Sequence, residues 1–200
     1  MQSQLTDNLR AFVKQIKKSE LISFDIETLV EDGKFLNNEN IIAISYCTGD
    51  LNCNVFVAES EGEEETILQN FDLLLGNVKP AIILGYNHTG YDIPLISYKI
   101  RNFKDYKFWN IREYFGSAYT LDVMYLVKNL TGKIMKLEDA ISLYLGKSEL
   151  EAKMIPSLNG MGKGEAIKYL WKNERKKFET YSLNDSISTL KIFYKIMCDG

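Results

Sequence analysis

Apolar residues near the start of the chain recur at the spacing of a helix. Residues 5–18 bring five apolar side chains onto one helical stripe, and Thr6 or Asp7 is available to cap it. The pattern predicts a short leading helix with one buried face. The side chains on that stripe are Leu5, Leu9, Phe12, Val13 and Ile16.

The pattern then changes to the alternation that is typical of strands. Runs over 21–28, 41–47 and 52–58 are rich in apolar and β-branched residues, and residues 48–50 have the composition of a turn. We expect three antiparallel strands here, with the turn joining the second strand to the third.

From residue 62 onward, helical and extended patterns alternate. An acidic first turn opens a predicted helix over 62–75, and Gly76 is expected to end it. The run 81–86 is entirely apolar apart from its glycine and tyrosine, which is typical of a strand buried on both faces. A loop over 87–92 then leads into a helix that reaches about Ile100.

The segment 103–117 is aromatic and irregular, and it is predicted to lack regular structure. Residues 118–123 could supply a last strand, followed by helices over 125–130 and 137–145. Glycines and a proline make 147–164 the most evident loop of the chain.

A final helix is predicted from about Glu165 to Met197, either continuous or broken near Asn173. No internal repeat and no linker divides the sequence. The alternation of strands and helices predicts an α/β fold with a mixed central sheet and helices on its faces.

Composition narrows the class of protein. The chain has 200 residues, of which 46% are hydrophobic, 12% aromatic and 26% charged, so it can bury a core as a single domain. These values exclude a disordered chain, and the length excludes a polymerase or helicase with all its modules on this chain.

The net charge of −3 excludes a protein that coats nucleic acid through an overall positive electrostatic potential. Any binding of nucleic acid must therefore depend on local clusters of basic residues. Each basic cluster is either a nucleic-acid contact or a solvated face. The clusters are Arg10, Lys14, Lys17 and Lys18; Lys99, Arg101, Lys104 and Lys107; and Lys168, Lys172, Arg175, Lys176 and Lys177.

The ends of the sequence and its cysteines bear on the compartment. No basic start precedes an apolar run, and no apolar stretch reaches the roughly 18 residues of a membrane span, so we expect a cytoplasmic protein with no membrane contact. The three cysteines form no Cys-x-x-Cys. A two-residue turn at 49–50 would set Cys47 opposite Asn52, so a disulfide between Cys47 and Cys53 is not expected.

The first candidate for chemistry is a pair of acids on a predicted central strand. Asp25 and Glu27 are two residues apart, so both side chains leave the same face of the sheet, while Phe24 and Ile26 leave the other. Burying like charges side by side is costly unless a cation neutralises them, and Mg²⁺ and Mn²⁺ choose carboxylate ligands. The alternative is a strand with a solvated polar face.

Two further groups carry weaker signals. Asp92 follows a buried strand at the edge where α/β sheets bind ligands, although alone it would be a helix cap or a first-turn acid. Tyr181 and Asp185 are four residues apart and so share one face of the last helix, which alone could be a surface pair.

Taken in order, these groups resemble the three exonuclease motifs of the DEDD superfamily, in its tyrosine branch. Phe24-Asp25-Ile26-Glu27 and the segment 85–94 look more narrowly like the proofreading exonuclease domain of family B DNA polymerases. The resemblance covers about residues 20–197; no polymerase palm or thumb follows, and residues 1–18 have no counterpart. Supporting matches are Leu121-Asp122-Val123, Lys136-Leu137 and Leu145-Gly146-Lys147.

The resemblance implies a ribonuclease H-like fold and a site that holds two divalent cations, Mg²⁺ or Mn²⁺. Two such ions, about 3.5–4 Å apart, stabilise the charge on phosphorus, activate water and stabilise the leaving oxygen. By analogy, Asp25, Glu27 and Asp185 would hold the ion that activates water, and Asp25 would bridge to a second ion supported by Asp92. Tyr181 would orient the attacking water, because a phenol hydrogen-bonds better than it acts as a base near pH 7.

Four residues are assigned to substrate binding. Asn87 contacts the terminal nucleotide or braces its loop, and His88 touches a phosphate or is a plain turn histidine. Thr28 and Tyr91 complete the set, while Asp122 matches a family aspartate near the site but is expected to cap a helix. Most aromatic residues are expected in the core, and only one or two of the candidates are expected to stack on unpaired bases. The candidate platforms are Tyr86, Tyr91, Phe108, Trp109 and Tyr114.

The sequence therefore predicts one exonuclease domain over 1–200, with 1–18 as a helical extension. Its expected activity removes nucleotides from 3′ ends of single-stranded DNA and releases 5′-mononucleotides. Alternatives are an RNA-directed 3′-to-5′ exonuclease, since no residue visibly reads the 2′-hydroxyl, or a weakly active binding subunit of a replication or repair complex.

Overall fold

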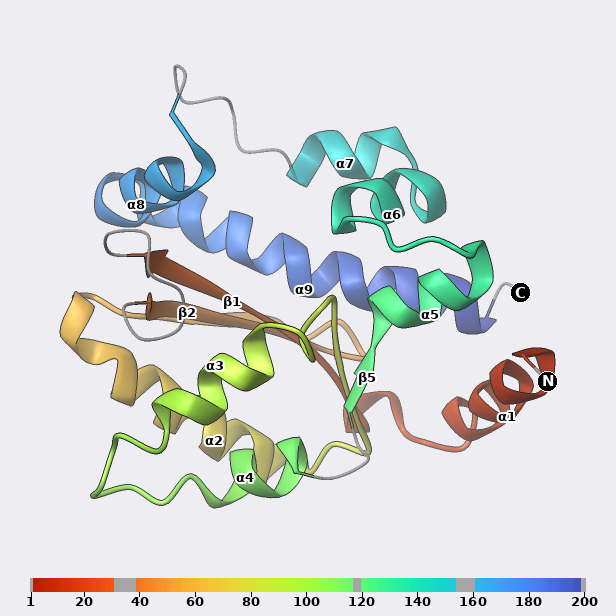
Figure 1. Ribbon diagram of the computed structural model, residues 1–200, viewed down its shortest axis with the longest axis horizontal. Helices are drawn as coiled ribbons and strands as arrows, with labels where there is room; N and C mark the ends of the chain where they lie inside the picture. Colours follow the sequence, from red (N-terminus) through yellow and green to blue (C-terminus); the bar gives the residue numbers. More distant parts are fainter. Residues whose placement is uncertain (1, 31–38, 117–119, 154–160, 199–200) are drawn as a thin grey trace.

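The computed structural model describes residues 2–30, 39–116, 120–153 and 161–198. They form one five-stranded sheet with helices on both faces (Figure 1). The strand order is β3-β2-β1-β4-β5; β2 is antiparallel to β1 and β3, whereas β4 is parallel to β1 and β5 is parallel to β4. The strands are β1 (Leu21–Val30), β2 (Glu39–Thr48), β3 (Cys53–Val57), β4 (Ile82–Gly85) and β5 (Thr120–Asp122).

The predicted α/β class, with three antiparallel strands first, is confirmed. None of the helices in the described part of the chain combines the length and hydrophobicity needed to cross a membrane. The α-helices are α1 (Gln2–Val13), α2 (Glu64–Val78), α3 (Asp92–Lys99), α4 (Trp109–Phe115), α5 (Val123–Thr131), α6 (Leu137–Tyr144), α7 (Lys147–Lys153), α8 (Lys163–Asn173) and α9 (Arg175–Cys198). Short 3₁₀ turns are η1 (Lys18–Glu20) and η2 (Glu61–Glu63).

One face of the sheet is covered by α2, α3 and α4 (Figure 1). Among the side chains that β1 sends to this face are Ile22, Phe24 and Ile26, and all three are buried. Phe24 packs against Phe71 of α2 with ring centroids 5.2 Å apart. This face is therefore an apolar core of the ordinary kind.

The opposite face is covered by α9, which packs on β1, β2 and β3 (Figure 1). Apolar clusters occupy its two ends, with Leu21 and Phe193 at one end and Leu29 and Phe178 at the other. Between them lies a set of mostly buried polar side chains that we call the polar belt. Its members are Ser23, Asp25, Glu27 and Ser45 from the sheet, and Ser182, Asp185, Ser186 and Thr189 from α9.

A register shift interrupts the pairing of β1 with β2 between Glu27 and Thr28. Glu27 pairs with Ala43 and Thr28 with Ile41, so β2 has one extra residue at this point. Such bulges re-aim side chains and are common beside functional sites. This bulge lies directly after the second acid of β1.

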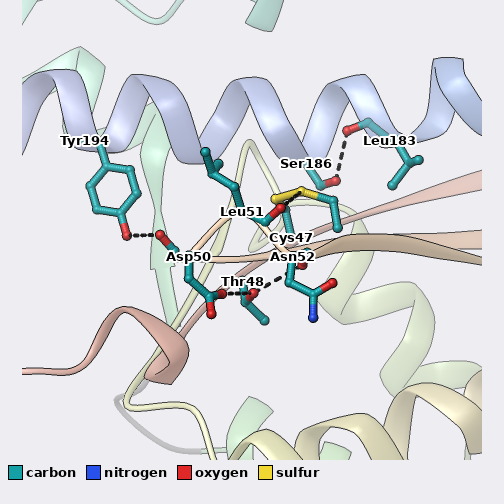
Figure 2. The surroundings of a disulfide bond; sticks show 10 residues. Cys47, Thr48, Asp50, Leu51, Asn52, Leu183, Ser186 and Tyr194 are labelled. Atoms are coloured by element: carbon teal, nitrogen blue, oxygen red, sulfur yellow. Dashed lines mark hydrogen bonds between the residues drawn. A yellow bond between two sulfur atoms is a disulfide. The ribbon is translucent and has the colours of Figure 1, made fainter.

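The hairpin between β2 and β3 corrects one prediction. Thr48 N donates to Asn52 O at 3.0 Å, so the loop holds three residues, and the last of them, Leu51, has φ 64°. Three-residue hairpins end in such a left-handed residue, which shifts the register by one. Cys47 therefore pairs with Cys53, and the two form a disulfide beside α9 (Figure 2).

The predicted end of α2 at Gly76 is also wrong, because the helix continues to Val78 and ends at Lys79, which has φ 49°. The glycine serves packing instead. A Cβ at Gly76 would lie 2.8 Å from Asn110 Nδ2, so only glycine lets α4 approach α2 this closely.

Two segments that were predicted to be irregular contain helices. In 103–117 the structure has α4, held by Asp72, whose carboxylate accepts hydrogen bonds from Tyr106 Oη, Asn110 Nδ2 and Ile111 N. In 147–164 it has α7, whose residues are good helix formers that precede the proline and glycines. Residues 154–160 of that predicted loop lie outside the described part.

The two ends of the chain meet at α9. The long C-terminal helical run is broken at Glu174, between α8 and α9, so the broken alternative holds. The leading helix ends at Val13 rather than at residue 18, and Arg10 Nη2 donates to Ile196 O at 3.1 Å. Phe12 was expected in the buried stripe, but it is 46% exposed.

Candidate metal centre and its surroundings

The first side of the candidate site is β1. Its alternation sends Asp25 and Glu27 into the polar belt beneath α9, as the spacing of two predicts. Asp25 is half-buried, whereas Glu27 is only 6% exposed. The alternative of a solvated polar strand face is therefore wrong.

The second side is α9, which sends Tyr181 and Asp185 toward the same belt. Both are buried, Asp185 at 7% exposure. One carboxylate oxygen from each of Asp25, Glu27 and Asp185 lies within 4.8 Å of the other two. Carboxylates that are far apart in the sequence thus converge between β1 and α9.

The chemistry of this group fits a divalent cation. Three carboxylates with little access to water repel one another, and a cation removes that cost. Carboxylate oxygens are the ligands that Mg²⁺ and Mn²⁺ prefer. Within the described residues, the nearby Ser23 and Ser182 hydroxyls are buried without a hydrogen-bond partner, so the belt also has unused polar atoms.

Tyr181 lies within the electrostatic reach of the three acids. Burial raises the pKa of its phenol, and the charges of Glu27, Asp185 and Asp25 raise it further. The phenol is therefore protonated near pH 7. It can donate or accept a hydrogen bond, but it does not act there as a free base.

Asp92 approaches the backbone of β1 at Ile26. It is the first residue of α3 and is 4% exposed, and its Oδ1 accepts a hydrogen bond from Ile26 N at 3.2 Å. β4 pairs with β1 only at Leu21–Ser23. The Asp92 carboxylate therefore accepts from the amide of a β1 residue that lies beyond the end of β4. Burial raises the pKa of Asp92, and the nearby His88 opposes that shift.

Asp92 is not a member of the three-carboxylate group, although its hydrogen bond places it beside the residue between Asp25 and Glu27. A first-turn acid was the expectation for Asp92 taken alone, and it does begin a helix. Its role at a metal stays a prediction.

The loop before α3 holds Asn87 in the left-handed region, with φ 61°, and leaves its side chain exposed. Asn87 O accepts hydrogen bonds from Gly90 N and Tyr91 N. A Cβ at Gly90 would lie 2.7 Å from Asn87 Oδ1, so this glycine makes room for the asparagine. Asn87 is therefore available for contact with a ligand.

His88 needs a correction, because its ring is 1% exposed. It meets Phe24 edge-on, with ring centroids 5.8 Å apart, and its Nδ1 lies 3.5 Å from Asp122 Oδ2. A buried ring does not reach a phosphate in this conformation. The sequence carried no signal for this, because a single polar residue in a loop gives no period from which to infer burial.

Thr28 and Tyr91 lie on the face of the sheet opposite the three carboxylates. Thr28 Oγ1 is 3.0 Å from Tyr91 Oη, and that hydroxyl also donates to the carboxylate of Glu39. Burial raises the pKa of Tyr91, as does its hydrogen bond to Glu39. The structure thus brings the two together, but not with the metal candidates, and their contact with substrate stays a prediction.

Most of the candidate stacking platforms belong to the core. Phe108 is fully buried, and Tyr86 and Tyr114 are each 9% exposed. Trp109 is 72% exposed, but it lies on α4, which covers the face opposite α9. The expectation that most of these rings lie in the core is confirmed for Phe108, Tyr86 and Tyr114.

The basic clusters are largely engaged with acids or backbone. Lys99 is buried with its Nζ 3.1 Å from Glu64 Oε1. Arg175 donates to Val57 O and Ala58 O and pairs with Glu59. Lys99 and Arg175 therefore have structural roles, and a nucleic-acid contact by the remaining basic residues stays a prediction.

Sequence reasoning missed how much Asp122 does. It caps α5 by accepting from Met124 N at 3.0 Å, as expected. The same carboxylate also accepts hydrogen bonds from Asn87 N and from Thr89. The match at Leu121-Asp122-Val123 was the one signal that pointed there.

Comparison with known proteins places these residues in a family context. The family model described as "DNA polymerase family B, exonuclease domain" matches residues 4–116. The fold is similar to that of the family B DNA polymerase from the hyperthermophilic archaeon Pyrobaculum calidifontis, with a TM-score of 0.60 and 22% identity over 88% of this chain. The matched part is 24% of that polymerase, and a search of curated proteins found no match. The fold is thus ribonuclease H-like, as expected.

Proposed function

The chain belongs to the family of DNA polymerase family B exonuclease domains, and from that premise we propose that it is a 3′-to-5′ exonuclease acting on single-stranded DNA. The products would be 5′-mononucleotides. Exonuclease domains of this family use divalent metals, and we propose two ions, Mg²⁺ or Mn²⁺, for this one. We treat residues 1–200 as one catalytic domain. The family match begins at residue 4, so the expectation that residues 1–18 have no counterpart is wrong for most of that segment, whose helix packs on α9.

The observation that carries the proposal is the convergence of Asp25, Glu27 and Asp185 between β1 and α9. The family match ends before α9, so residues outside that match complete the group. A purely structural domain has no need to place three acids together at little exposure, because each buried carboxylate costs stability.

Asp25, Glu27 and Asp185 would hold the ions, and Asp92 would support the second of them. When bound, the ions would stabilise charge on phosphorus and lower the pKa of a bound water. Tyr181 keeps its proton near pH 7, so its hydroxyl is suited to fixing the attacking water by a hydrogen bond. Asn87, exposed near the start of the β4–α3 loop, is the candidate contact for the terminal nucleotide.

The test is an end-labelled degradation assay. The purified protein is mixed with a 5′-labelled single-stranded DNA oligonucleotide and Mg²⁺ or Mn²⁺, beside an EDTA control and the variant Asp25→Ala. A matched control is Asp105→Ala, which removes an exposed acid in the loop between α3 and α4. We expect a ladder that shortens from the 3′ end in the wild type and in Asp105→Ala only.

An RNA oligonucleotide of the same sequence tests the substrate class. Faster cleavage of RNA would replace the DNA proposal with an RNA-directed exonuclease. No cleavage by the wild type would reject the catalytic proposal in favour of a binding subunit. Cleavage that survives Asp25→Ala would show that the site assignment is wrong.

A further inference from the structure

The loop that joins β4 to α3 carries Asn87 and leads to Asp92. Hydrogen bonds to a residue of another strand, β5, hold this loop in place. Four hydrogen-bond donors converge on the carboxylate of Asp122, at the end of β5. Asn87 N and Met124 N donate to Oδ1 at 2.9 and 3.0 Å. Thr89 N and Thr89 Oγ1 donate to Oδ2 at 3.2 and 2.6 Å. Only the bond from Met124 belongs to the capping of a helix.

This carboxylate is suited to hold a loop. Asp122 is 6% exposed, so water does not compete strongly for its oxygens. Burial alone would raise its pKa, but the nearby His88 and the hydrogen bonds from Thr89 outweigh that effect and lower the pKa. The group is therefore ionised near pH 7, and hydrogen bonds to an ionised acceptor are stronger than neutral ones.

The support continues through His88 to β1. The ring of His88 lies between Asp122 and Phe24, the residue before Asp25. A Cβ at Gly85 would lie 2.5 Å from two atoms of the His88 side chain, so only glycine lets the ring lie there. The loop is thus packed against the strand that carries two of the proposed metal ligands.

The loop in turn sets the start of α3. His88 O accepts a hydrogen bond from Ile93 N at 2.9 Å, and Asn87 O accepts one from Tyr91 N at 3.2 Å. These bonds fix the residues on both sides of Asp92. Asp92 Oδ1 then meets Ile26 N at 3.2 Å.

We infer that Asp122 is a positioning residue of the exonuclease site: its carboxylate clamps the loop 87–89 and thereby sets the places of Asn87 and Asp92. The inference rests on the proposed function for its catalytic consequence, but the clamp itself can be tested without activity. Asp122 touches neither the three-carboxylate group nor a reacting atom, so it acts through the loop.

The variant Asp122→Asn separates capping from clamping. An asparagine caps helices about as well as an aspartate, and its oxygen can keep the bonds from Met124 N and Asn87 N. Its NH₂ group would instead face Thr89 N, and two donors cannot bond. A pure cap would therefore tolerate Asp122→Asn, whereas a clamp would not.

The matched control is Asp72→Asn. Asp72 is also a buried carboxylate that accepts three hydrogen bonds, but it holds α4 on the opposite face of the sheet. A second pair probes one bond of the clamp in case Asp122→Asn does not fold. Thr89→Val removes the hydroxyl that donates to Asp122, and Thr89→Ser keeps it.

The first readout is amide hydrogen exchange, which does not depend on activity. We expect Asp122→Asn to speed exchange at Thr89 and also at Ile26, whose amide reports the place of Asp92, while Ile111 is unchanged. Asp72→Asn should speed exchange at Ile111 and leave exchange at Thr89 and Ile26 unchanged. Unchanged exchange at Ile26 would overturn the inference, even if the wild type proves to have no nuclease activity.

The second readout is kcat on single-stranded DNA at saturating metal. We expect Asp122→Asn to lower kcat between about 10-fold and 100-fold, because small displacements of a site cost that much, with no such loss in Asp72→Asn. Thr89→Val should lose about 2- to 10-fold and Thr89→Ser should not. A normal kcat in Asp122→Asn, with Ile26 exchange raised, would overturn the positioning role. An inactive wild type would reject the proposed function instead.

Discussion

The two faces of β1 differ although they alternate along the same ten residues. Ile22, Phe24 and Ile26 point to α2, α3 and α4 and form a continuous apolar core. Ser23, Asp25 and Glu27 point to α9 and form the middle of the polar belt. One face of the strand is built for stability, and the other places like charges together at a cost in stability.

The difference teaches where each face can be changed. Burial of apolar side chains stabilises in proportion to the area removed from water, so the α2–α4 face tolerates few truncations. The polar belt buries repelling groups, so removal of one charge relieves strain while it removes chemistry. Activity and stability should therefore respond in opposite ways on the two faces.

The largest expected effect is the loss of activity in Asp185→Asn. We expect kcat to fall at least about 10³-fold. The ions would stabilise the transition state by several kcal/mol, and each carboxylate ligand contributes to that stabilisation. The free energy of unfolding in EDTA should stay the same or rise, because one repelling charge is gone. Oligonucleotide degradation and urea unfolding measure the two quantities.

The matched control for Asp185→Asn is Glu179→Gln on the same helix. Glu179 forms an ion pair with Arg175 at 3.3 Å and is not one of the three clustered acids, so both quantities should change little. A large loss of stability in Asp185→Asn would contradict the cost assigned to the polar belt.

The second effect is on the apolar face. Phe71→Ala truncates a fully buried ring of α2 and should lower the free energy of unfolding by about 3–5 kcal/mol. The kcat of the folded fraction should change little. Leu73→Ala on the same helix is the control, because Leu73 is 53% exposed and its loss should cost less than about 0.5 kcal/mol. A fall in the kcat of Phe71→Ala as large as that of Asp185→Asn would contradict the distinction between the two faces.

The third effect concerns Tyr181, whose ring packs among apolar side chains while its phenol lies near the three acids. Tyr181→Phe keeps the ring among its apolar neighbours and removes the hydroxyl near the acids. We expect kcat to fall about 10- to 100-fold with stability unchanged, as for the loss of one hydrogen bond to a charged group.

The pH profile sharpens the prediction for Tyr181. Since burial and the three acids raise the phenol pKa above its ordinary value of 10, the hydroxyl does not titrate between pH 7 and 9. The wild type and Tyr181→Phe should therefore give pH–rate profiles of the same shape over that range. A limb present only in the wild type would mean that the phenolate takes part.

The smallest expected effect concerns the covalent link on the α9 face. Cys47 lies opposite Ser23 and is joined to Cys53 across a sequence separation of 6 (Figure 2). Cys53→Ser should lower the free energy of unfolding by about 2 kcal/mol, the loop-closure contribution for so short a loop. Reductant should produce the same loss in the wild type. Cys198→Ser, at an exposed free cysteine, should produce none.

Local periodicity predicted much of the site. A spacing of two on a strand places Asp25 and Glu27 on one face in any sheet, and a spacing of four on a helix does the same for Tyr181 and Asp185. The buried character of β4 also followed from its composition, and all four of its residues are buried. These predictions succeeded because they depend only on residues that are close in the sequence.

The errors share the opposite property. The register of the β2–β3 hairpin depended on the backbone of Leu51, and the course of α2 through Gly76 depended on Asn110 of another helix. The burial of His88 depended on Phe24 and Asp122, which lie far from it in the chain. Such contacts override local propensity and leave no period to detect.

The sequence by itself therefore determined which side chains share a face: two acids on one strand, and an acid with a phenol on one helix. Only the tertiary structure decided that those faces meet, that Glu27 and Asp185 are buried, and that Asp122 reaches across to the loop of Asn87. The physical reason is the separation in sequence over which each effect acts. Backbone geometry repeats every two or 3.6 residues, whereas the packing of α9 on β1 joins segments that approach only when the whole core is assembled.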